Sequence, residues 1–185
     1  MVEAQGTDGH VYMTNSSFYT NDSNGTAGAI AVNDGLQSNV TIHKSRFFNN
    51  TANIALINLN SAKMYVQDSY FFDNLATQVT NGFQVSESTL NITSSKIDNC
   101  LRRSCDDDKI TSRRLTAFEH MTRGRNLQSA ASSTPDERDI LAGFFYVSSN
   151  SKLDVASTTV KRVTGKIGGA AMIMTSSDLI IREGS

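Results

Sequence analysis

The chain of 185 residues is poor in the residues that mark several common protein classes. It has one proline, no tryptophan and two cysteines, and no apolar run approaches the roughly 20 residues of a membrane-spanning helix. Its 17 basic and 18 acidic residues leave a net charge of -1, so it lacks the basic surface that binds nucleic acid or anionic membranes. These absences predict neither a membrane span nor a nucleic-acid partner.

The two cysteines stand close together, at Cys100 and Cys105. Their spacing permits a disulfide that closes a small ring in an oxidising compartment, and it equally permits two unpaired thiols. A zinc site would need further ligands nearby, and only His120 and the acidic run 106–108 offer any. The sequence therefore predicts no metal site and no cofactor.

What the chain has in abundance is one repeated pattern, seen most clearly in residues 40–52. Two apolar residues alternate, a serine follows, then a phenylalanine and an asparagine: Val40, Ile42, Ser45, Phe47 and Asn50. The same template fits Val11, Met13, Ser16, Phe18 and Asn21, and again Met64, Val66, Ser69, Phe71 and Asn74. Shorter matches begin at Leu90, Leu153 and Leu179. An apolar period of two indicates strands with one buried face.

Each of the first five copies is followed by a second apolar strand, at residues 28–32, 54–59, 83–85, 143–147 and 169–173. The first apolar residues of the copies are separated by 29, 24, 26, 63 and 26 residues. Periods of about 20 to 50 residues are typical of solenoids. Because the apolar period inside each copy is two rather than 3.6, helical repeats are excluded.

We therefore predict a right-handed, single-stranded parallel β-helix of about five coils, with an antiparallel β-sandwich as the alternative. The first apolar residues should stack as one buried column, made of Val11, Val40, Met64, Leu90, Leu153 and Leu179. Phe18, Phe47 and Phe71 should form a second column, and Asn21, Asn50, Asn74 and Asn99 a ladder at a corner. Asparagine suits a corner because it tolerates the left-handed conformation and can bond to its equivalent in the next coil.

The long gap between the fourth and fifth copies divides the chain into three parts. Residues 1–99 are predicted to be β-helix coils, residues 100–142 a charged and partly flexible insertion loop, and residues 143–185 the continuation of the same β-helix. A short helix near residues 110–121 is expected inside the insertion. Two interpretations remain open for this loop: it displays a binding surface for a ligand or partner, or it is a tolerated surface excursion.

The repeats resemble those of the polymorphic outer-membrane protein family, which are autotransporter passenger domains. The resemblance rests on Phe-x-x-Asn at residues 18–21, 47–50 and 71–74, and on the glycine motifs at residues 28–30 and 168–171. It implies a pectin-lyase-like right-handed β-helix at a cell surface, often adhesive. Six Asn-x-Ser/Thr sequons, at Asn15, Asn21, Asn24, Asn39, Asn49 and Asn91, agree with a secreted glycoprotein. An extracellular or cell-surface location is therefore predicted.

A search for chemistry finds no catalytic residues, because the three histidines lie far apart in the repeat and no serine or cysteine has a plausible His/Asp arrangement beside it. One charged group remains. Asp73 and Asp98 are expected at the same position of successive coils, and the next coil places Lys161 and Arg162 there. Close carboxylates invite a cation or a basic neighbour, so this is either a site or a surface ladder neutralised by Lys161.

These observations predict a non-enzymatic surface module, structural or adhesive, with a glycan or a surface protein as its ligand. The alternative is a polysaccharide lyase or glycoside hydrolase of the pectin-lyase-like fold, for which Asp73 and Asp98 are the starting residues. The sixth copy begins at Leu179 and Ile181 and reaches only Ser185. We therefore expect this coil to pair end to end with another copy, or to continue in a longer protein.

Overall fold

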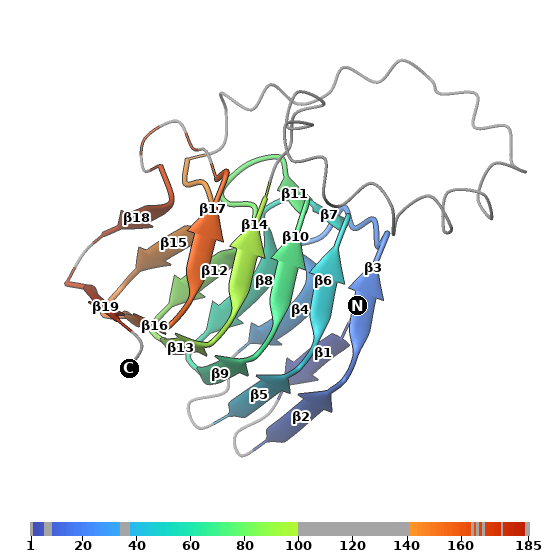
Figure 1. Ribbon diagram of the computed structural model, residues 1–185, viewed down its shortest axis with the longest axis horizontal. Coiled ribbons are helices and arrows are strands. Elements are labelled where there is room, and N and C mark those ends of the chain that lie inside the picture. The colour runs from blue at the N-terminus through green and yellow to red at the C-terminus, as the bar shows by residue number, and fades with distance from the viewer. Residues whose placement is uncertain are drawn as a thin grey trace, which may run out of the picture. The chain divides into compact units, whose positions relative to one another are not determined.

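A computed structural model describes residues 2–5, 9–33, 38–99, 141–163, 165, 167, 169–174 and 176–183, with only the backbone described for residues 2–5. All regular structure in these residues is β-strand, and every strand pairing is parallel (Figure 1). The predicted parallel β-helix of about five coils is confirmed, and the β-sandwich alternative is wrong. The helix expected near residues 110–121, the cysteines and nearly all of the insertion lie outside the described residues.

Three parallel sheets run the length of the solenoid, and each coil contributes one strand to each sheet in turn. The β4 sheet has the order β1 (Val2–Gln5), β4 (Ala27–Asn33), β8 (Ala55–Asn60), β12 (Phe83–Ser86), β15 (Phe145–Ser148), β18 (Ala171–Ile173). The β5 sheet has the order β2 (His10–Thr14), β5 (Asn39–His43), β9 (Lys63–Gln67), β13 (Thr89–Thr93), β16 (Lys152–Ala156), β19 (Asp178–Arg182).

The β6 sheet has the order β3 (Ser17–Tyr19), β6 (Arg46–Phe48), β10 (Tyr70–Phe72), β14 (Lys96–Asp98), β17 (Thr159–Lys161). Its strands lie side by side at the front of Figure 1. A short pair, β7 (Thr51–Ala52) and β11 (Leu75–Ala76), follows the corner that closes two of these coils. Each three-residue strand of this sheet has only one inward side chain, at its centre. That one residue is the strand's whole contribution to the hydrophobic core.

The apolar column predicted from the repeat is present in the predicted register. Val11 pairs with Val40, Val40 with Met64, Met64 with Leu90, Leu90 with Leu153 and Leu153 with Leu179. The column is buried from Val40 to Leu153, whereas Leu179 is 41% exposed on the edge strand β19. The period-two pattern therefore placed the inward face of the β5 sheet correctly.

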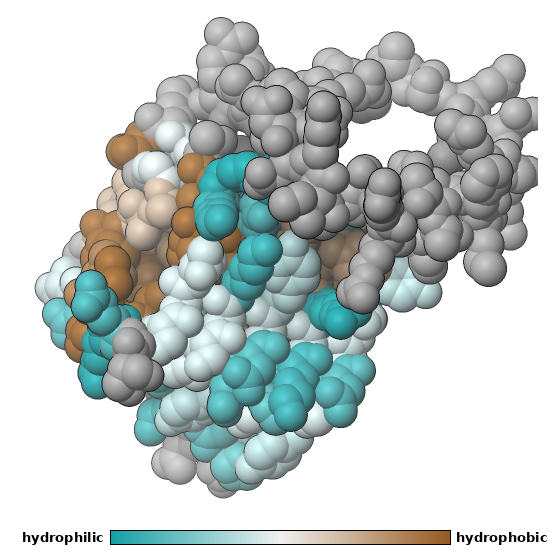
Figure 2. Space-filling view, viewed as in Figure 1, coloured by the Kyte–Doolittle hydropathy of each residue, from teal (hydrophilic) through white to brown (hydrophobic). Residues whose placement is uncertain are grey.

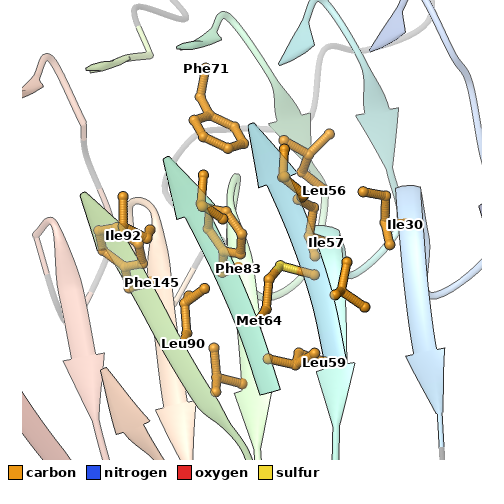
Figure 3. Close-up of a cluster of buried hydrophobic side chains, with 14 of the residues drawn as sticks. Ile30, Leu56, Ile57, Leu59, Met64, Phe71, Phe83, Leu90, Ile92 and Phe145 are labelled. Carbon is orange, nitrogen blue, oxygen red and sulfur yellow. The ribbon is translucent and has the colours of Figure 1, made fainter. Parts of the chain in front are cut away.

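The second column consists of aromatic rings from the β6 sheet. Phe18 stacks on Phe47 with ring centroids 4.7 Å apart, and Phe47 stacks on Phe71 at 4.9 Å. Phe83 and Phe144 then meet the Phe71 ring edge to face. Figure 3 shows Phe71 and Phe83 with aliphatic side chains from neighbouring coils, all pointing into one continuous interior. One coil alone could not bury these rings, so the coils stabilise one another.

The asparagine ladder bonds each coil to the next at the corner after the β6 sheet. The Asn50 side-chain oxygen accepts hydrogen bonds from the backbone and side-chain nitrogens of Asn21, at 3.2 and 2.7 Å. Asn74 does the same for Asn50, and Asn99 accepts from the Asn74 backbone nitrogen. The predicted ladder is confirmed, and it satisfies polar groups that the corner buries.

The left-handed residue at this corner is not the asparagine, so that part of the prediction is wrong. The residue before it has positive φ instead: Thr20 (49°), Asn49 (53°) and Asp73 (47°). The ladder asparagines Asn21, Asn50 and Asn74 are not among the residues with positive φ, and their amides bond to the neighbouring coil. A left-handed residue one position earlier turns the chain and lets the amide point toward that coil.

Candidate functional site

The repeat places aromatic side chains on the outside of the solenoid as well as inside it. Each of the first three coils carries an aromatic doublet in the β6 sheet: Phe18-Tyr19, Phe47-Phe48 and Phe71-Phe72. Because successive strand residues point to opposite faces, the first ring of each doublet enters the core and the second faces outward. We call Tyr19, Phe48 and Phe72 the outer aromatic row. They pair in register across three adjacent strands.

The outer aromatic row is accessible to ligands. Tyr19 is 51% exposed, and Phe48 and Phe72 are half-buried. The Tyr19 ring stacks on Phe48 with centroids 5.4 Å apart and planes 11° apart. Tyr70, two residues before Phe72 on β10, adds a fourth outward ring 5.9 Å from it. Within the described residues, four outward aromatic rings therefore gather on one sheet face, and such a cluster is a candidate interaction surface.

Beyond β10, the outward positions of the β6 sheet that continue the outer aromatic row are charged. In the register of Phe72, β14 has Asp98 and β17 has Lys161. Arg162 follows Lys161 at the left-handed corner, with φ of 52°. We call Asp73, Asp98, Lys161 and Arg162 the ionic corner; these are the four residues that the sequence singled out.

Asp73 and Asp98 do not occupy equivalent positions, so the predicted equivalence is wrong. Asp98 pairs with Phe72, whereas Asp73 lies one residue later, at the left-handed corner. The reason is a one-residue deletion: Phe71 and Asn74 are separated by two residues, but Ile97 and Asn99 by one. The ladder keeps its register by losing the left-handed residue of the fourth coil. The two residues still adjoin, because the Asp73 nitrogen donates to the Asp98 carbonyl oxygen at 3.4 Å.

Arg162, rather than Lys161, neutralises the buried acid. The Arg162 Nε donates to the Asp98 Oδ1 at 2.7 Å, and the Asp98 side chain is 7% exposed. Burial raises the pKa of the neighbouring Tyr70, and the charges of Asp98 and Asp73 raise it further. Lys96 lies with its Nζ 5.3 Å from the Tyr70 ring centroid. The ionic corner therefore contains one ion pair, between Asp98 and Arg162, and the raised pKa of the neighbouring Tyr70 favours its protonated form.

The histidines and cysteines that the sequence analysis considered do not form a catalytic or metal-binding group in the described residues. Within the described part of the chain, no group of three or more His, Cys, Asp and Glu side chains could hold a metal ion. His10 and His43 lie outward on the β5 sheet, and His43 Nε2 is 3.2 Å from Asp68 Oδ2. His120, Cys100 and Cys105 lie outside the described residues. No helix that is long and apolar enough to cross a membrane occurs among the residues searched.

The outer aromatic row was missed by the sequence analysis, although the sequence carries its signal. The repeat template includes only the inward phenylalanine of each doublet. It does not include the second, outward aromatic residue. An outward position of a solvated strand is ordinarily polar, so an aromatic residue there in three successive coils departs from the alternation expected for one buried face. That recurrence is the signal.

Comparison with protein-family models, with curated proteins and with solved structures found no match for this chain.

Proposed function

We propose that this chain is a non-enzymatic β-solenoid recognition module that is displayed outside the cell and binds a glycan along its outer aromatic row. The repeats support a structural scaffold, since each coil buries its apolar side only against its neighbours. The observation that carries the recognition role is the outward placement of Tyr19, Phe48 and Phe72 in register on β3, β6 and β10.

Glycan is the ligand class that suits this surface. Sugar rings have C–H-rich faces that pack on aromatic side chains, and their hydroxyl groups bond to polar neighbours. The row offers both kinds of group, because exposed Ser17 and Arg46 lie on the same face, on β3 and β6. Arg46 also supplies a fixed positive charge with several donors, which suits hydroxyl or carboxylate oxygens.

The extracellular or cell-surface location rests on the repeat and the sequons. The resemblance to polymorphic outer-membrane protein repeats implies surface display and adhesion. Of the sequon asparagines, Asn15 and Asn24 are exposed in turns, and Asn39 and Asn91 lie on the outward face of the β5 sheet. Glycans attached at Asn39 and Asn91 would project from the β5 sheet rather than from the face that holds the outer aromatic row.

The test is a glycan array followed by titration of the strongest hit against matched tyrosine variants. Tyr19→Ser removes an exposed ring from the outer aromatic row. Tyr65→Ser is the control, since Tyr65 is 44% exposed on β9, in a different sheet. We expect Tyr19→Ser to weaken binding by about tenfold or more, as loss of an aromatic contact commonly does, and Tyr65→Ser to leave it unchanged.

Three results would contradict the proposal. A chain that binds no glycan on the array, but does bind a purified surface protein through the same row, would reassign the ligand to a protein. Equal losses in Tyr19→Ser and Tyr65→Ser would mean that the row is not the site. Loss in Tyr65→Ser alone would move the site to the β5 sheet.

The alternative function, a polysaccharide lyase or hydrolase, depends on the ionic corner. Its support is the adjacency of Asp73 and Asp98 and the neutral state of Tyr70, which could donate a proton. The ion pair between Asp98 and Arg162 favours a structural role, because the Asp98 carboxylate is buried and already bonded to the Arg162 guanidinium. Incubation with acidic polysaccharides, monitored by the absorbance of unsaturated products, would reveal lyase activity.

A further inference from the structure

The chain contains two asparagine–glycine dipeptides, Asn24-Gly25 and Asn81-Gly82, and the structure places them in opposite surroundings. An asparagine before a glycine readily loses its side-chain amide, because glycine has no Cβ to shield its backbone nitrogen and leaves the chain free to turn. In a folded chain, the reaction also requires that the pair is exposed and able to move. The contacts of each dipeptide therefore decide its reactivity.

Asn24 and Gly25 are both exposed, in the turn that leads into β4. The Gly25 nitrogen donates to Ser23 Oγ at 3.1 Å, so its hydrogen bond lies within the turn itself. Backbone hydrogen bonds to the next coil hold the turn on both sides, at the Ser23 nitrogen (3.2 Å) and at the Thr26 carbonyl oxygen (3.3 Å). The two residues between these anchors can therefore rearrange while both bonds to the next coil stay in place.

Asn81 and Gly82, in contrast, are fixed in the interior. Asn81 is 1% exposed, and its Oδ1 accepts a hydrogen bond from the Ala76 nitrogen at 2.8 Å. A Cβ added at Gly82 would collide with the carbonyl oxygen and the ring of Phe144, so packing requires the glycine there. The Asn81 amide can react only when this segment opens.

We propose that Asn24 is a self-modification site, at which the folded chain converts a side-chain amide into a carboxylate. The Gly25 backbone nitrogen loses its proton and forms a bond to the Asn24 Cγ, and the side-chain nitrogen leaves as ammonia. Water then opens the resulting cyclic imide at one of its two carbonyl groups. The products are aspartate, which keeps the original backbone, and isoaspartate, in which the backbone runs through the former side chain. One water is consumed and one ammonia is released.

The reaction needs only water and changes the charge of the turn. Water reaches the reacting residues because they are exposed, and hydrophilic residues make up much of the solenoid face seen in Figure 2. Asp22 is already exposed in this turn, where its Oδ1 accepts a hydrogen bond from Thr51 Oγ1 at 2.7 Å. A carboxylate at position 24 therefore adds a second negative charge close to the first.

The first test incubates the folded whole chain in mildly alkaline buffer at physiological temperature. The chain is made in a host that adds no N-glycans, since Asn24 also begins a sequon. Trypsin then releases residues 1–44 and 64–96, which carry one dipeptide each, and tandem mass spectrometry follows amide loss at each asparagine. We expect Asn24 to react at least about tenfold faster than Asn81, which must wait for local opening. In guanidinium chloride, the two rates should become similar.

The second test identifies the attacking nitrogen with a variant of the turn. A Cβ added at Gly25 would meet only the end of a flexible side chain, Ser23 Oγ at 3.2 Å, so Gly25→Ala should keep the turn. It should slow amide loss at Asn24 by about tenfold or more, because the methyl group crowds the nitrogen and restricts the backbone. Tyr65→Ser, in a different sheet, is the control and should leave the rate unchanged. Circular dichroism checks that each variant is folded.

Three results would overturn the proposal. One is an Asn24 amide that persists in the folded chain but is lost in guanidinium chloride, because the native turn would then hold the pair in an unreactive shape. Another is equal rates at Asn24 and Asn81 in the folded chain, because exposure would then not select the site. An unchanged rate in a folded Gly25→Ala variant would show that the Gly25 nitrogen is not the attacking group.

Discussion

At the scale of single residues, the direction of each side chain decides its tolerance to change. Val40 is buried in the first apolar column, and its neighbour Thr41 points outward on the same strand. Val40→Asp should lower the free energy of unfolding by about 4 kcal/mol or more, because a carboxylate would be buried between stacked coils without a partner. Thr41→Asp should change it by less than about 1 kcal/mol.

Urea unfolding followed by circular dichroism measures both variants. Equal damage from the two changes would mean that the inward face of the β5 sheet has been assigned wrongly.

The asparagine ladder gives a second prediction at this scale. Asn50 is buried and bonds to Asn21 on one side, to Asn74 on the other, and to the carbonyl oxygen of Phe18 at 3.1 Å. Asn50→Ala leaves several buried groups without partners, so we expect a loss of about 2–4 kcal/mol in the free energy of unfolding. Asn58→Ala, at a half-exposed position on β8, is the control and should cost less than about 1 kcal/mol. Thermal and urea denaturation give the comparison.

At the scale of elements, the fourth coil closes on both sides of the long insertion. Asn99 belongs to the ladder, and Ala142 forms a bridge with Thr80 of the preceding coil. Since both anchors lie within the solenoid, replacing residues 101–139 with a short Gly/Ser linker should leave the solenoid folded. The expected change in melting temperature is a few degrees, as for most changes of loop length. A much larger loss would show that the replaced residues pack against the coils.

At the scale of the whole molecule, the solenoid is a linear array in which each coil contacts only its neighbours. Central strands such as β9 and β13 are paired on both edges, and their inward side chains are fully buried. We therefore expect amide hydrogen exchange to be slowest there and faster in the edge strands β2 and β19. Mass spectrometry of peptides resolves this gradient. Uniform exchange throughout the described strands would contradict the array.

The amino-acid sequence alone was sufficient for the fold, because a solenoid repeats one local rule. Alternation in Val40 and Ile42 sets which side is buried, and the spacing between copies sets which residues stack. The registers of the apolar, phenylalanine and asparagine columns follow directly, since a parallel coil places equivalent residues beside each other.

Only the tertiary structure decided where the repeat departs from its own rule. The deletion before Asn99 moves Asp98 into register with Phe72 and Lys161. An alignment of the copies on their corner asparagines hides this shift of one residue, because it places Asp98 beside Asp73. Arg162 rather than Lys161 pairs with Asp98 because its side chain reaches across the corner. The spacing of residues along the sequence does not predict this reach. The sequence alone determined the stacking of the coils because it depends on short-range periodicity, and the structure decided the charge pairing because it depends on distances between coils.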